Sequence, residues 1–339
     1  MTARVSADWS FNGVQALVLE NDRLRVVVLP ELGGKIWQIA HLRAGRDLLW
    51  HNPRLTARPV PVGSNYDDVF FGGWDELFPN DLAEEIAGEP YPDHGELWAA
   101  PWSWRIEQDG PERVRVSLAM ATAISACRIV KNIELVTGES TLRLSWTIEN
   151  GSHQDLPYLW KQHVAVPTGD PAVLTMGARS MYVEDFGHPR AGGTGSRYDW
   201  PHLTDDAGRV HDMRPTLPAD SRVAEFQYAT ELDEGWCAVT WPDGSGIGLV
   251  FDRDVFRSCW TFASYGGWRA HEVLVLEPCT GHPVSVNAGV GAGTHQVLPA
   301  GGVLETELLM VAYEGMAEVT GMDHDGSPRG TRLDSQGAA

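Results

Sequence analysis

Three side chains from distant parts of the chain have the types and settings that proton-transfer chemistry needs. His94 lies in the segment 91–98 (YPDHGELW), where Gly95 marks a turn, and Glu277 follows an apolar run that begins at residue 273. His163 lies within the apolar segment 158–166 (YLWKQHVAV). An imidazole exchanges protons near neutral pH, and a carboxylate can serve as its complementary base. Opening a sugar ring needs such groups, because one oxygen loses a proton while another gains one.

Each of these three residues also has a purely structural interpretation. A histidine in a turn is often a surface or capping residue, and a histidine in an apolar segment is often kept neutral by burial. A carboxylate that ends an apolar strand faces either a cleft or the solvent, because charged residues are rarely buried without a partner. Close to Glu277 in the sequence, the alternative candidates are His271, Glu272 and His282.

A second group of residues has the chemistry to hold a sugar. Tryptophan combines an apolar face with one N–H donor, although most of the 14 tryptophans must fill the core of a large β-protein. The candidates for the lining of a sugar pocket are Trp74, Asp75, Glu76, Trp98 and Trp160. Lys161, Arg128 and Arg269 can donate hydrogen bonds to sugar hydroxyls or to an anionic substituent, and the sequence does not select among them.

Strands are the elements that would position these residues. Residues 141–150 alternate apolar and polar side chains, which predicts a strand with one buried face. Residues 235–252 predict a hairpin, because two apolar runs flank the turn sequence PDGSG. Further strands are expected at 23–29, 113–118, 127–136, 273–276 and 303–313. Many antiparallel strands with Gly/Pro turns predict an all-β fold, either a large antiparallel β-sandwich or a barrel.

The chain shows no linker between two halves. We therefore expect one domain over residues 1–317 and a disordered tail over residues 318–339, where the apolar periodicity is lost. Two long irregular stretches, 52–90 and 182–219, are rich in Gly, Pro, Asp and Arg. Loops of this length in a compact domain are usually functional or disordered, and the aromatic residues of the first favour order. We expect both stretches to wall a site whose floor is a concave sheet face.

Composition and charge restrict the partners of the protein. The 46 acidic and 26 basic residues give a formal charge of -20, which repels nucleic acids and anionic membrane surfaces. The first residues lack the apolar core of a signal peptide and no run is apolar enough to span a membrane, which predicts a cytoplasmic protein. The four cysteines lack CxxC spacing, which favours free thiols over disulfides or zinc. We expect neither a metal nor another cofactor, and the composition neither supports nor excludes a homodimer.

Several short motifs, taken in order, resemble the aldose 1-epimerase, or galactose mutarotase-like, superfamily. The resemblance covers most of the chain and rests on the segments 32–37 (LGGKIW), 47–50 (DLLW), 73–80 (GWDELFPN), 92–102, 160–163 (WKQH), 276–278 (LEP) and 298–301 (LPAG). It implies a large twisted β-sandwich that holds a free sugar in a cleft and opens its ring at the anomeric carbon. Residues 161–166 (KQHVAV) depart from the family's best-known branch, which has a motif like NHxYFN.

The resemblance also implies roles for the three candidate residues. Glu277 would be the general base at the C1 hydroxyl, His163 the general acid at the ring oxygen, and His94 a hydrogen-bonding partner of the ring or anomeric oxygen. The leading hypothesis is therefore a mutarotase that binds a small carbohydrate and interconverts its anomers. A noncatalytic carbohydrate-binding protein is the second hypothesis. A lyase or hydrolase is the third, although the sequence offers only one clear acid where a glycosidase needs two.

Overall fold

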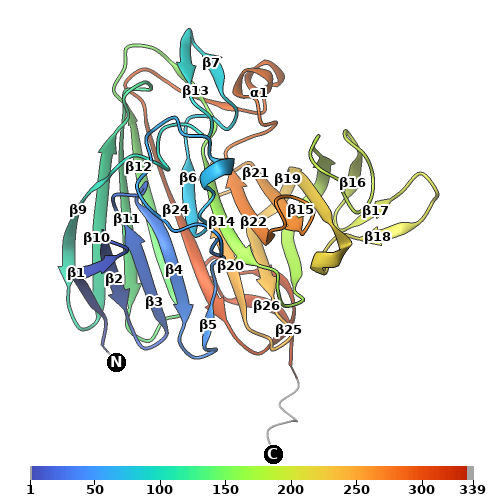
Figure 1. Cartoon of the computed structure of the whole chain (residues 1–339), viewed down its shortest axis with the longest axis horizontal. Coiled ribbons are helices and arrows are strands. Elements are labelled where there is room, and N and C mark those ends of the chain that lie inside the picture. Colours follow the sequence, from blue (N-terminus) through green and yellow to red (C-terminus); the bar gives the residue numbers. More distant parts are fainter. Residues whose placement is uncertain (1, 334–339) are drawn as a thin grey trace, which may run out of the picture.

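The computed structural model describes residues 2–333, and nearly all of its regular structure is β-strand (Figure 1). Eighteen strands form one antiparallel sheet that curls into two facing layers. The first layer contains, in order across the sheet, β1 (Arg4–Phe11), β2 (Val14–Glu20), β3 (Leu24–Leu29), β4 (Lys35–His41), β6 (Trp74–Leu77), β14 (Lys161–Pro167), β22 (Glu272–Cys279) and β21 (Ser258–Tyr265). The second contains β9 (Ser103–Asp109), β10 (Arg113–Ala121), β11 (Cys127–Val136), β12 (Thr141–Asn150), β24 (Val303–Tyr313) and β20 (Gly246–Phe251).

One long strand joins the two layers. The 18 residues of β19 (Val223–Thr240) pair first with β21, where Val223 lies opposite Tyr265, and then with β20, where Trp236 lies opposite Val250. β15 (Val173–Val183) pairs along most of β19, and β16 (Arg197–Asp199) pairs with the last part of β15. The sheet therefore continues from one layer into the other, as a large β-sandwich.

The core lies between the layers and takes every second side chain of the strands. On β14, Val164 and Val166 point into this core, as Leu274 and Leu276 do on the adjacent strand β22. Because side chains alternate along a strand, the residues between them point to the opposite face of the first layer. That face is covered by loops from 52–102, so its side chains are buried as well.

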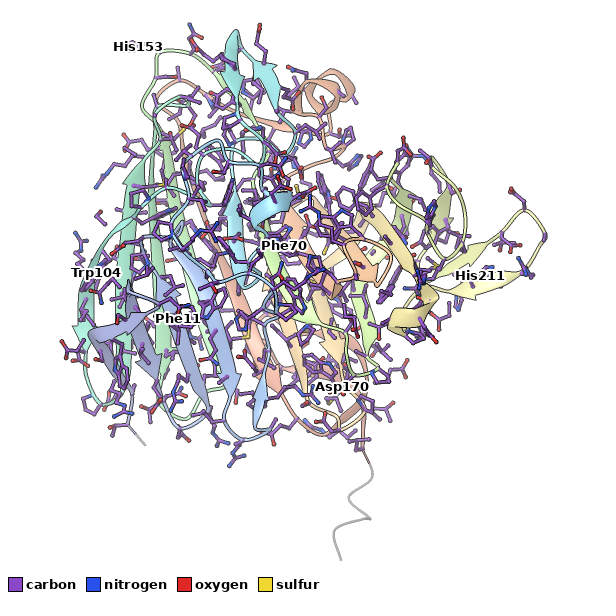
Figure 2. The ribbon with its side chains drawn as sticks, in the orientation of Figure 1. Phe11, Phe70, Trp104, His153, Asp170 and His211 are labelled. Atoms are coloured by element: carbon purple, nitrogen blue, oxygen red, sulfur yellow. The ribbon has the colours of Figure 1, made fainter. Side chains whose placement is uncertain are left out.

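Short elements complete the fold. Within the sheet, β5 (Arg46–Asp47) pairs with β4. Outside the sheet lie the 3-10 turns η1 (Asp67–Val69) and η2 (Ala219–Ser221) and the helix α1 (Val286–Ala292). Three small two-stranded pairs also lie outside it, namely β7 (Glu84–Ile86) with β8 (Glu89–Tyr91), β13 (Leu156–Tyr158) with β23 (Gln296–Leu298), and β17 (His202–Thr204) with β18 (Val210–Asp212). The last pair projects from one side of the molecule, where His211 is labelled in Figure 2. Within residues 2–333, no helix is long and apolar enough to cross a membrane.

The strand expected at 141–150 coincides with β12, and the expected hairpin is formed by β19 and β20. The expectation of a disordered tail from residue 318 is wrong as far as residue 333, and residues 334–339 lie outside the described part. β25 (Met316–Met322) pairs with β26 (Pro328–Arg332), and its apolar side chains pack against Trp236. Two register shifts in this pairing break the alternation of apolar residues, so the sequence pattern did not indicate a strand.

Candidate active site

The structure brings Glu277, His163 and His94 together around one cavity of about 400 Å³ on the loop-covered face of the first layer. A cavity of this size falls within the range of small-molecule sites. Five aromatic side chains form an apolar part of its wall, namely Phe70, Phe186, Phe226, Phe262 and Trp268. Phe70 is labelled in Figure 2, near the middle of the molecule and beside η1.

Strand register places two of the three residues. On β14, Lys161 lies opposite Cys279 of β22, and His163 lies opposite Asp75 of β6. Glu277 is two residues before Cys279, so a period of two puts its side chain on the same face as Lys161 and His163. The sequence of these strands therefore fixes which groups face the cavity.

A tight loop places the third residue. His94 has a left-handed backbone conformation with φ of 60°, which is uncommon for a residue other than glycine. Its backbone N–H donates to Asp81 O at 2.7 Å, which ties the loop to the segment after β6. The next residue must be glycine, because a Cβ atom on Gly95 would lie 2.1 Å from Phe78 O. The imidazole of His94 stacks on the ring of Tyr66, with centroids 4.2 Å apart and planes inclined by 10°.

Lys161 is the central cation of the site. Its Nζ lies 2.5 Å from Glu277 Oε2 and 2.5 Å from Asp81 Oδ2, and 4.7 Å from the centre of the Trp260 ring. Burial disfavours the ammonium, but the two carboxylates outweigh burial and raise the pKa of Lys161. Burial also raises the pKa of Glu277, against the opposing effect of Lys161. Glu277 is therefore a stronger base than an exposed glutamate.

The surroundings of His94 favour its charged form. Burial disfavours the imidazolium, but Asp81 and Asp93 reverse this effect, and the pKa of His94 is raised. Nδ1 lies 2.9 Å from Asp93 Oδ1. Nε2 lies 3.9 Å from Asp81 Oδ1, which is beyond hydrogen-bonding distance. Nε2–H is therefore the donor of this ring that a ligand can use.

His163 is neutral, and its hydrogen bonds select one tautomer. Burial, Lys161 and His94 lower its pKa well below the ordinary value. The Tyr66 hydroxyl donates its only proton to Asp75 Oδ2 at 2.8 Å, and Asp75 Oδ2 is also 2.5 Å from Lys35 Nζ. The same hydroxyl oxygen is 3.1 Å from His163 Nδ1, so it accepts from Nδ1–H. Nε2 of His163 then carries a lone pair and can accept a hydrogen bond.

Seven of the eight expected pocket residues do not line the cavity. Trp74, Glu76 and Trp160 point to the opposite face of the first layer, where Trp74 donates to Gln162 and Trp160 packs against Trp146. Trp98 packs edge-on against Tyr66 behind the cavity. Arg128 is exposed on β11, in the second layer. Most tryptophans here fill space, and the sequence alone did not separate the two faces of β6 and β14.

The remaining expected residues support the site from outside or line it directly. Lys161 lines the cavity, whereas Asp75 lies behind Tyr66 and binds its hydroxyl. Arg269 does not face the cavity; it donates to Asp67 O at 2.6 Å and pairs with Asp68, which fixes η1 at the rim. Among the alternatives near Glu277, the imidazole of His271 is bound by Arg54, whose Nη2 lies 2.8 Å from His271 Nδ1.

Sequence reasoning missed two groups that are central to the geometry, Tyr66 and Asp81. Asp81 directly follows the segment 73–80, so its position beside a motif was an available signal. Tyr66 lies in the middle of a long loop with no pattern around it, so only its contacts identify it. In residues 2–333, no group of three or more His, Cys, Asp or Glu side chains is arranged to hold a metal ion.

Comparisons with known proteins identify the fold. No protein-family model matches the chain, and no curated protein matches it either. Among solved structures, a provisionally assigned aldose 1-epimerase from Escherichia coli K12 is 16% identical, with a TM-score of 0.63 over 88% of this chain and 98% of that one. A galactose mutarotase-like protein from Clostridium acetobutylicum is 10% identical, with a TM-score of 0.65 over 92% and 99%. A protein from Synechocystis sp. PCC 6803 is 17% identical, with a TM-score of 0.63 over 91% and 99%.

Proposed function

Because the chain has the galactose mutarotase-like fold, we propose that it is an acid/base isomerase that interconverts the α and β anomers of a monosaccharide. The observation that carries this proposal is the convergence of Glu277, His163 and His94 on one cavity next to an aromatic wall. Aromatic rings suit the apolar face of a sugar ring, and the titratable groups suit its hydroxyls. The chemistry needs only proton transfers, which these side chains can supply themselves.

The proton transfers can be assigned from the charge states. Glu277 takes the proton of the C1 hydroxyl, the C1–ring oxygen bond breaks, and its electron pair moves to the ring oxygen. The imidazolium of His94 gives that oxygen a proton through Nε2–H, and C1 becomes the carbonyl carbon of the open chain. Rotation about the C1–C2 bond and the reverse transfers then close the ring on the other face of C1.

This assignment differs from the one implied by family resemblance, in which His163 is the general acid. A neutral His163 with a lone pair on Nε2 has no proton to donate to the ring oxygen. It suits a different task, to accept a hydrogen bond from a sugar hydroxyl and hold the sugar in register. His94, with its raised pKa, is the better proton donor.

A second candidate function is carbohydrate binding without catalysis. The ion pair between Glu277 and Lys161 favours this candidate, because the ammonium at 2.5 Å opposes the effect of burial and makes Glu277 a weaker base than it would be without Lys161. The two functions differ in the effect of Glu277→Gln. Catalysis requires a loss of about a hundredfold in rate with binding retained, whereas a binding protein keeps its affinity and has no rate to lose.

The decisive experiment is to follow anomer exchange directly. Freshly dissolved α-anomers of common aldoses are mixed with the purified protein, and the approach to anomeric equilibrium is measured by polarimetry and by saturation-transfer NMR. We expect an acceleration over buffer that is proportional to protein concentration for at least one aldose. A folded protein that accelerates none of them but binds sugars would support the second candidate and contradict the first.

A further inference from the structure

The charges on the cavity wall restrict the substrate more than its shape does. Two cations face the cavity, Lys161 and His94, and both are already paired with carboxylates. Six carboxylates line the same cavity, namely Asp67, Asp81, Asp93, Glu184, Asp185 and Glu277. Among the lining residues that the structure describes there is no arginine. A bound molecule therefore meets an excess of negative charge.

Three of these carboxylates have no cationic partner among residues 2–333. Asp67, Glu184 and Asp185 form no ion pair within 4 Å. Glu184 accepts a hydrogen bond only from neutral donors, such as the Tyr228 hydroxyl at 3.1 Å, and Asp185 accepts from the Thr194 hydroxyl at 3.0 Å. Burial raises the pKa of Asp67, against the opposing charges of His94 and Arg269, and the charges of Asp93 and Asp81 act in the same direction as burial. These groups can still accept hydrogen bonds from a ligand.

We infer that the cavity selects a monosaccharide without any anionic group, either an uncharged sugar or one with an amino substituent, and excludes sugar phosphates and uronates. This inference rests on the proposed sugar-directed function of the same cavity. Sugar hydroxyls and an ammonium group are donors that match free carboxylates. A phosphate needs cationic or N–H donors, and both cations of this wall are already taken by its own carboxylates.

The test compares four sugars that share the glucose ring and differ in one charged substituent: glucose, glucosamine, glucose 6-phosphate and glucuronate. Anomer exchange of each is measured by saturation-transfer NMR at low salt. We expect glucose and glucosamine to be accelerated, and kcat/KM for the two anionic sugars to be lower by about a hundredfold, because like charges brought together strongly oppose binding. Equal or higher kcat/KM for glucose 6-phosphate would overturn the inference.

A pair of matched variants shows whether the selection is local. Glu184→Gln with Asp185→Asn removes two charges from the cavity wall, whereas Glu305→Gln with Glu307→Gln removes two from exposed positions on β24. We expect only the first pair to reduce the ratio of kcat/KM for glucose to kcat/KM for glucose 6-phosphate, by about tenfold. An equal reduction of this ratio by both pairs would mean that the net charge of the protein, and not the cavity, sets the preference.

A binding measurement separates this inference from the proposed activity. If no sugar of any charge shows accelerated exchange, the isomerase proposal fails, and tryptophan fluorescence titration with the same four sugars still tests the selection. Affinity for glucose or glucosamine at least tenfold above that for the anionic pair supports it. Equal affinity for all four sugars, or no affinity for any of them, contradicts it.

Discussion

The two faces of β6 carry similar buried charges and use them differently. Asp75 and Glu76 are neighbours on this strand and point to opposite faces, and each binds a buried lysine: Asp75 Oδ2 lies 2.5 Å from Lys35 Nζ, and Glu76 Oε1 lies 2.6 Å from Lys131 Nζ. On the core face the network ends there, because within residues 2–333 the only further polar partners of Lys131 Nζ are Gly34 O and the Trp102 ring.

On the cavity face the network continues. Asp75 accepts from the Tyr66 hydroxyl, and that hydroxyl accepts from His163, whose second nitrogen faces the cavity. A buried ion pair is therefore not by itself a sign of function. What distinguishes the cavity face is a chain of hydrogen bonds that reaches open volume.

The strongest test of this contrast breaks the core pair. Lys131→Met leaves the Glu76 carboxylate buried without a partner, and we expect the free energy of unfolding to fall by about 3–5 kcal/mol. The double variant Lys131→Met with Glu76→Leu removes both charges and should recover most of that loss. Urea denaturation measures both effects. If the double variant did not recover most of the lost stability, the core pair would have a role beyond packing.

The next test removes the base on the cavity face. Glu277→Gln keeps the size of the side chain and an oxygen for Lys161 but cannot take a proton, so kcat should fall by about a hundredfold. The matched control is Glu76→Gln on the core face, which should lower stability while kcat of the folded protein stays within about threefold of wild type. Equal losses of kcat in both variants would remove the distinction between the two faces.

A smaller effect is expected from Tyr66→Phe. The ring keeps its stacking on His94, but His163 and Asp75 lose the hydroxyl that joins them. We expect kcat to fall about tenfold, equivalent to about 1.4 kcal/mol in the barrier. Nitrogen NMR of His163 should show that the tautomer with a proton on Nδ1 is no longer dominant. Tyr313→Phe, which removes a buried hydroxyl far from the cavity, is the control and should leave the His163 signal unchanged.

The smallest effect concerns the pH dependence. Activity should fall on the acid side as Glu277 gains a proton, at a pH above the ordinary glutamate pKa of 4.5, because its pKa is raised. It should fall on the alkaline side as pH rises through the pKa of His94, which lies above the ordinary histidine pKa of 6.5. Asp93→Asn weakens the charge that favours the imidazolium, so the alkaline limb should move about one pH unit lower. An unchanged alkaline limb would mean that His94 is not the acid.

The fold was predictable from the sequence because its long strands carry clear signals. β12 forms nine residue pairs with β24. Its apolar and polar residues alternate over that length, and few structures other than a strand fit such a pattern. The sequence did not predict β6, because the strand has only four residues and two of them are adjacent acids, a composition typical of a loop. Only the distant lysines Lys35 and Lys131 make a buried strand of that composition stable.

The site was predictable in its main residues but not in its charge states. The motifs around His94, His163 and Glu277 identified the three side chains, and the structure brings them together. Which histidine holds a proton depends on Asp81 and Tyr66, and no local pattern links these to their partners. A proton position follows from several contacts at once, so it required the three-dimensional arrangement.

The pairing of strands that lie far apart in the sequence has a consequence for biosynthesis. β12 pairs with β24, and β14 pairs with β22, so the earlier strand of each pair is synthesised long before its partner. Until the partner has left the ribosome, the earlier strand keeps an open edge that can pair with other chains. Closure over such separations is intrinsically slow, which exposes the growing polypeptide to aggregation until these partners are made.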